Sequence, residues 1–112
     1  MISEQILSRD WSPEFIQGMQ NRIIMSHYKY GWMSETYGNR LASAIGSLEM
    51  RLDLYKETGN TELLMDIANF AMIEYMFPQH KDAHFRALSS EESPGLDGIS
   101  AKELMEGAND QV

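Results

Sequence analysis

The sequence predicts an all-α protein, a small bundle of three main helices with short helical turns beside them. Two observations predict this class: apolar residues recur at helical spacing in three stretches, and turn-forming residues separate those stretches. No alternating β pattern competes with the helical one. One helix is apolar around most of its circumference, so we expect oligomerisation into a homodimer or a larger assembly to complete the bundle.

The first predicted helix covers about residues 13 to 30. Ser12 is a suitable N-cap, Pro13 fits the first helical position, and Gly31 is a natural stop. One further helical turn is expected near Ser34, in an aromatic-rich connection. The apolar face of the first helix consists of Phe15, Ile16, Met19, Ile23 and Tyr30.

The second helix is predicted over about residues 40 to 57. The third runs from the turn at 58–61 to Phe77, where Pro78 ends it. Because the third helix is apolar on most of its surface, we expect it to be buried at the centre of the bundle. Its narrow polar stripe consists of Glu62, Asp66 and Asn69. The inner stripe of the second helix consists of Leu41, Ile45, Leu48, Leu52 and Tyr55.

The length of 112 residues fits one domain, predicted over residues 1–88 and followed by an acidic tail over residues 89–112. The tail holds six acidic residues against one lysine, so it carries −5 of the formal net charge of −8. A capping box and a hydrophobic staple predict a short helix near residues 101–106.

Composition restricts the compartment and the ligand class. The chain has no cysteine, which is typical of a reducing compartment, and it shows neither a basic leader nor an apolar run long enough to span a bilayer. These features predict a cytoplasmic protein that does not bind a membrane. The negative net charge argues against direct nucleic-acid binding, because phosphate contacts require clustered lysine and arginine. Nucleotides stay possible ligands, since a metal ion can bridge them to acidic residues.

Two pairs of carboxylates flank the turn between the second and third helices. Glu49 and Asp53 precede the turn, Glu62 and Asp66 follow it, and the members of each pair stand four residues apart. Residues at this spacing share a helix face, so an antiparallel hairpin can bring all four acids together. Adjacent carboxylates repel one another unless a cation compensates them, which predicts a magnesium site. The alternative is that these acids form an ordinary solvated surface.

The run from Glu62 through Asp66 to Asn69 resembles the third-helix signature of the MazG-like all-α nucleoside triphosphate pyrophosphatases, including small phage-type members. In that family a Glu and an Asp are followed by an Asn. The resemblance extends over roughly residues 41 to 77, but the acidic pairs are spaced by four where the family spaces them by three. Two leucines stand where the family's pattern has an acid: Leu52 and Leu63.

The resemblance implies a protein that handles nucleotides. In an active member of the family, the acids bind magnesium and the enzyme splits a nucleotide between its α and β phosphates. For this chain the implied metal ligands are Glu49, Asp53, Glu62 and Asp66, and Asn69 would orient a ligand or a water molecule. A relative that binds a nucleotide without cleaving it is the alternative within the same class.

Basic and aromatic residues of the first two helices are candidates for contacts with such a ligand. Arg22, Lys29 and Arg51 can neutralise phosphate. His27 and Tyr30 flank Lys29 in an aromatic-rich stretch that can stack on a base. The simpler interpretation is that these cations are surface charges that balance the acids, and that His27 is a hydrogen-bonded boundary residue.

Two further interpretations compete with nucleotide handling. His80 and His84 have the spacing of a helical metal site, but they follow Pro78 in a segment of uncertain helicity and no Glu follows His80. A different class is a small acidic phage-type protein that inhibits a host or defence factor through its charged surface. Magnesium-dependent turnover would separate an enzyme from such an interaction protein.

Overall fold

The computed structural model describes residues 1–99, and these residues form five α-helices. This confirms the predicted all-α class. Within the described part of the chain the sole β feature is an isolated bridge between Leu96 and Ile99. The helix predicted near residues 101–106 lies outside the described residues. The five helices are α1 (Ile2–Asp10), α2 (Pro13–Tyr30), α3 (Met33–Thr36), α4 (Ala44–Thr58) and α5 (Glu62–Met76).

The bounds of α2 agree with the prediction from its capping residues. The Ser12 Oγ accepts a hydrogen bond from the backbone N–H of Phe15 at 3.0 Å, which satisfies one free donor of the first turn. Gly31 ends the helix with a φ of 82°, and its N–H donates to the carbonyl of His27 at 2.8 Å. The positive φ explains why glycine suits this position.

Helix α4 begins four residues later than predicted. Ser43 is its N-cap, because the Ser43 Oγ accepts a hydrogen bond from the N–H of Gly46 at 2.9 Å. Leu41, expected on the inner stripe of this helix, therefore precedes it and is 76% exposed. The helix ends at Gly59, whose left-handed conformation (φ 72°) reverses the chain into the turn before α5.

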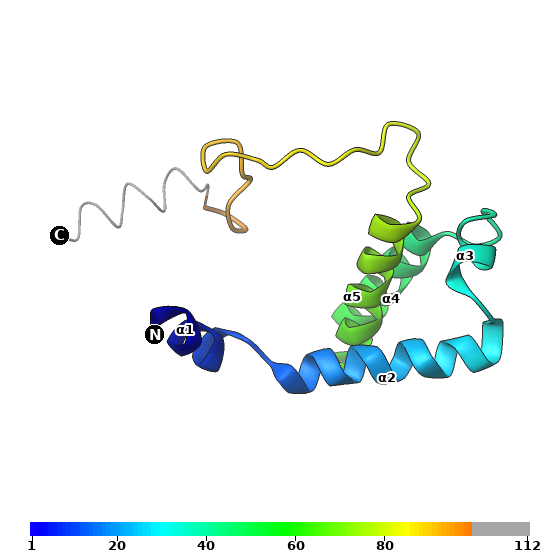
Figure 1. Ribbon diagram of the computed structural model, residues 1–112, viewed down its shortest axis with the longest axis horizontal. Helices are drawn as coiled ribbons and strands as arrows, with labels where there is room; N and C mark the ends of the chain where they lie inside the picture. Colours follow the sequence, from blue (N-terminus) through cyan, green and yellow to red (C-terminus); the bar gives the residue numbers. More distant parts are fainter. Residues whose placement is uncertain (100–112) are drawn as a thin grey trace.

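Helices α4 and α5 form an antiparallel hairpin, and α2 crosses the hairpin near its base (Figure 1). The helices approach closely at Gly18, where an added Cβ would lie 2.4 Å from the Met65 Sδ. One turn further along α5, the Asn69 Nδ2 donates to the Met19 carbonyl at 3.0 Å. The lack of a side chain at Gly18 and the buried amide of Asn69 thus fix the crossing of α2 over α5.

The connection that contains α3 is held by Gln79, which follows α5. Its Nε2 donates to the carbonyls of Tyr37 at 3.1 Å and Ala42 at 2.7 Å. The backbone N–H of Gln79 donates in turn to the Glu74 carboxylate at 2.9 Å. These bonds join the segment before α4 to the end of α5, so α3 is held beside the upper part of the hairpin.

The buried core of a single chain is very small. Among the described residues, Ala44 and Ile73 are the sole buried apolar side chains, at 1% and 2% exposure. Among the helices of residues 1–99, α5 packs extensively against α4 and α2 only, so its central burial in an oligomer stays a prediction. Large side chains near its C-terminal end face outward, including Tyr75 and Met76.

Helix α1 was not predicted, and it stands apart from the hairpin at the left of Figure 1. All of its residues are exposed, and no side chain caps its first turn. The radius of gyration is 17.5 Å, whereas a compact chain of about 100 residues has roughly 13 Å.

No helix among residues 1–99 combines the length and the apolar character needed to cross a bilayer.

Candidate ligand pocket

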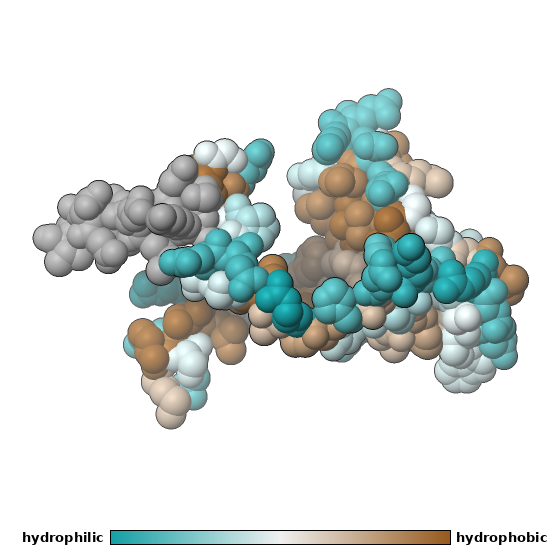
Figure 2. Space-filling model, turned by 90° about the horizontal axis from the view of Figure 1, so that it is seen from above, coloured by the Kyte–Doolittle hydropathy of each residue, from teal (hydrophilic) through white to brown (hydrophobic). Residues whose placement is uncertain are grey.

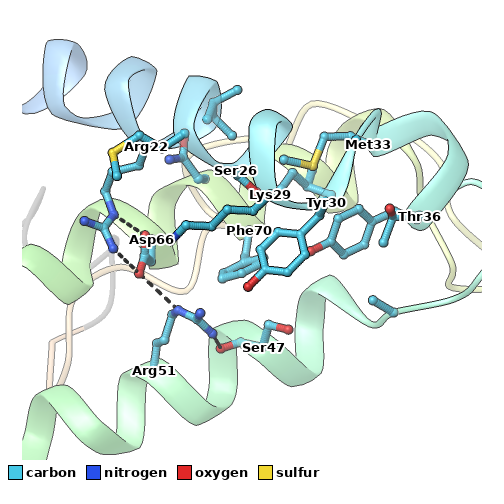
Figure 3. Close-up of a pocket in the computed structure, with 17 residues that line it drawn as sticks. Arg22, Ser26, Lys29, Tyr30, Met33, Thr36, Ser47, Arg51, Asp66 and Phe70 are labelled. Atoms are coloured by element: carbon cyan, nitrogen blue, oxygen red, sulfur yellow. Dashed lines mark hydrogen bonds and ion pairs between the residues drawn. The ribbon is translucent and has the colours of Figure 1, made fainter.

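A pocket of about 510 Å³ lies between the C-terminal half of α2, the α3 region and the facing sides of α4 and α5 (Figure 3). Basic, acidic, amide and aromatic side chains all contribute to its wall. We call it the arginine pocket, and its defining residues are Arg22, Lys29, Arg51, Asp66, Asn69 and Phe70.

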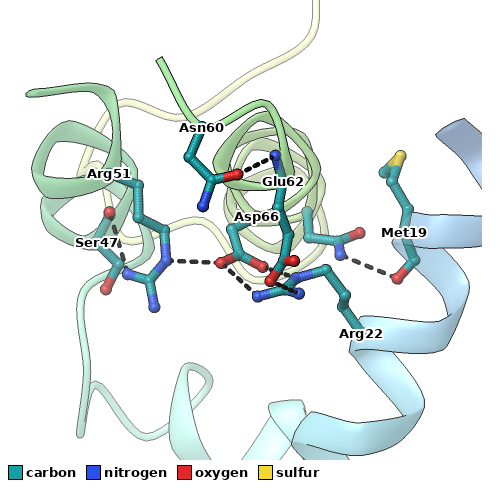
Figure 4. A network of polar contacts seen from close by, with 8 residues as sticks. Met19, Arg22, Ser47, Arg51, Asn60, Glu62 and Asp66 are labelled. Carbon is teal, nitrogen blue, oxygen red and sulfur yellow. Dashed lines mark hydrogen bonds and ion pairs between the residues drawn. The ribbon is translucent and has the colours of Figure 1, made fainter. Parts of the chain in front are cut away.

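Asp66 lies where the three long helices meet and accepts hydrogen bonds from two arginines (Figure 4). Arg22, from α2, donates through Nε and Nη2, and the Nη2 lies 3.0 Å from the Asp66 Oδ2. Arg51, from α4, donates through Nε to the same Oδ2 at 3.1 Å. The side chain of Asp66 is 15% exposed and each arginine side chain is about one-third exposed.

Each arginine is oriented by a second contact. The Arg22 Nη1 donates to the Glu62 Oε1 at 2.6 Å, one turn before Asp66 on α5. The Arg51 guanidinium lies 4.6 Å from the centre of the Phe70 ring, a cation–π distance. Both guanidinium groups are therefore held toward the pocket in one geometry.

Burial by itself raises the pKa of the Asp66 carboxyl, but the hydrogen bonds from Arg22 and Arg51 outweigh it and hold that pKa below its usual value. The pKa of Arg22 is raised, chiefly by its hydrogen bond to Asp66. Asp66 is consequently ionised at neutral pH and acts as the counter-ion of two cations.

Asn69 contributes the most buried polar group of the pocket, at 4% exposure. Its Nδ2 donates to the Met19 carbonyl, which fixes the orientation of the amide, and its Oδ1 has no hydrogen-bond partner among residues 1–99. A buried oxygen without a donor is unfavourable, commonly by about 1–3 kcal/mol. Because this oxygen is itself shielded from solvent, a ligand donor can satisfy it only after a shift of the surrounding side chains.

The four predicted metal ligands do not gather into one cluster. Glu62 and Asp66 share Arg22, whereas Glu49 and Asp53 are exposed on α4 and make no ion pair or side-chain hydrogen bond within residues 1–99. In that range no group of three or more His, Asp or Glu residues is arranged to hold a metal ion. The arginines occupy the place expected for a cation, so the side chains do not fit the predicted magnesium site as they stand. Magnesium binding stays a prediction.

The predicted ligand-binding residues mostly converge. Arg22, Lys29, Tyr30, Arg51 and Asn69 all line the arginine pocket. His27 does not: its ring packs on the Trp32 ring, with 4.4 Å between the ring centres, and it lines a separate apolar pocket.

The histidines after α5 lie in an exposed segment. The Nδ1 of His80 and the Nδ1 of His84 both hydrogen-bond to the backbone of Asp82, at 3.0 Å and 2.9 Å. This segment is not helical, so the four-residue spacing does not place the two rings on one helical face.

Sequence reasoning missed two aromatic residues of the arginine pocket, Tyr37 and Phe70. Phe70 follows Asp66 by four residues and thus shares its helix face, which is a signal that the sequence contains. Tyr37 gives no such signal, because Gln79 brings its segment to the pocket. Burial raises the pKa of the Tyr37 hydroxyl further above its usual value, and the protonated hydroxyl is able to donate a hydrogen bond.

Comparisons of the chain with protein-family models, curated proteins and solved structures find no match.

Proposed function

We propose that the protein binds a nucleotide in the arginine pocket and that binding is its primary function. One observation carries the proposal: in a chain of net charge −8, three cationic side chains line a single pocket together with aromatic rings. Arginine and lysine recognise phosphate, and aromatic rings stack on a base. The pocket volume of about 510 Å³ lies within the range of roughly 300–1,000 Å³ typical of small-molecule sites.

The cations are placed for a phosphate group. Arg22 and Arg51 share one carboxylate, so their guanidinium groups already lie close together at the pocket wall. An incoming phosphate offers more acceptor oxygens than Asp66 and can take up N–H groups that the carboxylate leaves free. Lys29 lines the same pocket and makes no ion pair among the described residues, so its charge is available to the ligand.

The base and the sugar of a nucleotide match the aromatic rings and the amide of the arginine pocket. Phe70, Tyr30 and Tyr37 provide ring surfaces for a base. The Asn69 Oδ1 lacks a donor among residues 1–99, and once a side-chain shift opens it, a base amino group or a ribose hydroxyl supplies one, whereas an ionised phosphate does not. A ligand that combines phosphate, sugar and base therefore satisfies more of this pocket than inorganic phosphate alone.

The test is a thermal-shift and calorimetry series with the four ribonucleoside triphosphates, their nucleosides and inorganic triphosphate, each with and without magnesium. We expect at least one nucleoside triphosphate to raise the melting temperature more than either its nucleoside or inorganic triphosphate, since binding to the native state stabilises it. The same samples are assayed for magnesium-dependent release of pyrophosphate, which would extend the function to hydrolysis.

Lys29→Met tests the site without disturbing the arginine network. We expect about a fivefold loss of affinity, because one charge contact contributes up to about 1 kcal/mol at an exposed position. Arg9→Met, on α1 and outside the pocket, is the matched control and should bind normally. If no nucleotide changes the melting temperature, or if both variants lose affinity equally, the proposal is wrong.

A further inference from the structure

A second pocket, of about 460 Å³, lies on another side of α2 and is lined mainly by apolar residues. We call it the apolar pocket. It extends along the C-terminal half of α2, past Gly31, and reaches the end of α5. Its large apolar residues include Ile24, Tyr28, Trp32, Met33, Met76 and Phe77, most of them substantially exposed. The described part of the chain leaves this pocket open.

Helix α1 exposes an apolar face that could pack against such a pocket. Ile2 and Ile6 lie on one face of the helix and are 69% and 51% exposed, with Leu7 beside them at 56%. Figure 2 shows this apolar surface in brown at the left of the molecule. A helix of 9 residues is marginal in water without packing, because nucleation is unfavourable. Helix α1 therefore needs an apolar partner.

Helix α1 cannot fill the apolar pocket of its own chain. Only Trp11 and Ser12, both extended, separate it from α2. Folded back along α2, a helix of 9 residues spans about 14 Å, and Ile23, the nearest pocket residue, already lies about 15 Å from the start of α2. The far side of the pocket, at Trp32, is further away still.

A second copy of the chain can cover both the exposed apolar face of α1 and the open apolar pocket. Within residues 1–99 of a single chain few apolar side chains are fully buried, and the radius of gyration of 17.5 Å is well above that of a compact domain of this length. Because each copy carries both the exposed helix and the open pocket, a two-fold arrangement satisfies the two surfaces reciprocally and closes the assembly.

We infer that the protein dimerises by exchange of its N-terminal helix, with α1 of each copy docked in the apolar pocket of the other. Ile2 and Ile6 then pack against residues such as Ile24 and Trp32. The short Trp11–Ser12 connection favours exchange over folding back. Because α1 makes no extensive contact with the other helices of residues 1–99, exchange breaks little of the described structure.

The chain has no cysteine, so single cysteines can be introduced without background pairing. We expect a mixture of the Ile6→Cys and Ile24→Cys proteins to form a disulfide-linked heterodimer in higher yield than either protein forms linked homodimers. Met50→Cys, on α4 and 67% exposed, is the control and should pair poorly with Ile6→Cys. Equal yields with the control, or predominant Ile6–Ile6 linkage, would overturn the inference.

Light scattering gives an independent measurement. We expect wild-type protein at micromolar concentration to have twice the chain mass of 12.8 kDa, and Ile6→Asp to shift to the monomer mass. Because α1 is exposed in the single chain, circular dichroism should show that Ile6→Asp keeps the helices of the hairpin. A monomeric wild type, or an Ile6→Asp protein that stays dimeric, contradicts helix exchange.

Discussion

Arg51 donates to Asp66 across the α4–α5 hairpin, with 3.1 Å between the Arg51 Nε and the Asp66 Oδ2. The same carboxylate accepts hydrogen bonds from Arg22 of α2, so one acid joins three helices. An ion pair of this kind orients its members as well as stabilising them, because each guanidinium loses the freedom to point into solvent. The arginine pocket therefore depends on Asp66 even if the ligand never touches that residue.

Asp66→Asn should destabilise the protein. The change keeps the side-chain shape but removes the charge that Arg22 and Arg51 share, and we expect unfolding free energy to fall by about 1–2 kcal/mol in urea titrations. Asp53→Asn is the control, since Asp53 is exposed and should change stability by less than about 0.5 kcal/mol. A more stable Asp66→Asn protein would instead indicate crowded, repelling carboxylates, as the magnesium-site hypothesis requires.

The pH dependence of stability follows from the ion pairs of Asp66 with Arg22 and Arg51. The pKa of Asp66 is lower in the folded protein than in the unfolded chain, so the ionised Asp66 carboxylate stabilises the folded state at neutral pH. That contribution is lost as the pH falls below about 4 and through the folded-state pKa. The difference in stability between wild type and Asp66→Asn should therefore shrink on acidification. A constant difference in unfolding free energy from pH 7 to about pH 3 would show that the ion pairs of Asp66 do not contribute to the pH dependence of stability.

Asn69→Leu should separate the structural role of Asn69 from its role in binding. The variant removes the bond to Met19 but also removes a buried oxygen that has no partner in the described part of the chain, so we expect stability to change by no more than about 1 kcal/mol. Nucleotide affinity should fall at least about fivefold, because the ligand loses an acceptor. Asn21→Leu, on the exposed side of α2, is the matched control for calorimetry. Unchanged affinity in Asn69→Leu would remove the amide from the binding site.

Gln79→Ala should loosen the segment that places Tyr37 in the arginine pocket. Gln79 donates to two backbone carbonyls, and loss of both bonds should cost about 1–2 kcal/mol of unfolding free energy. Nucleotide binding should weaken as well, since Tyr37 loses its fixed position. Gln20→Ala, exposed on α2, serves as the control. Hydrogen exchange of residues 37–42 checks the effect, and equal exchange in both variants would contradict it.

Deletion of the predicted acidic tail, residues 89–112, should leave the melting temperature nearly unchanged. The segment just before it, residues 81–88, is exposed throughout, so the predicted boundary falls where little packing is lost. Thermal unfolding of the shortened chain measures this directly. A large drop in melting temperature would place the domain boundary after residue 88, contrary to the prediction.

The sequence by itself determined the local elements with strong terminal signals. Ser12, Pro13 and Gly31 fixed the bounds of α2, and Pro78 marked the end of the hairpin, because caps and stops act on the nearest few residues. Two helix starts were not predicted correctly: α1 has no side-chain cap, and α4 begins at Ala44 after the N-cap Ser43, not near Arg40.

The tertiary structure alone decided the partners of Asp66 and Asn69. Both were expected on the polar stripe of the third helix, facing the acids of the second helix, yet α2 crosses that stripe and supplies Arg22 and the Met19 carbonyl. The crossing depends on the close approach at Gly18, far away in the sequence. Spacing along one helix shows which residues share a face, but the charge opposite that face depends on how separate helices pack.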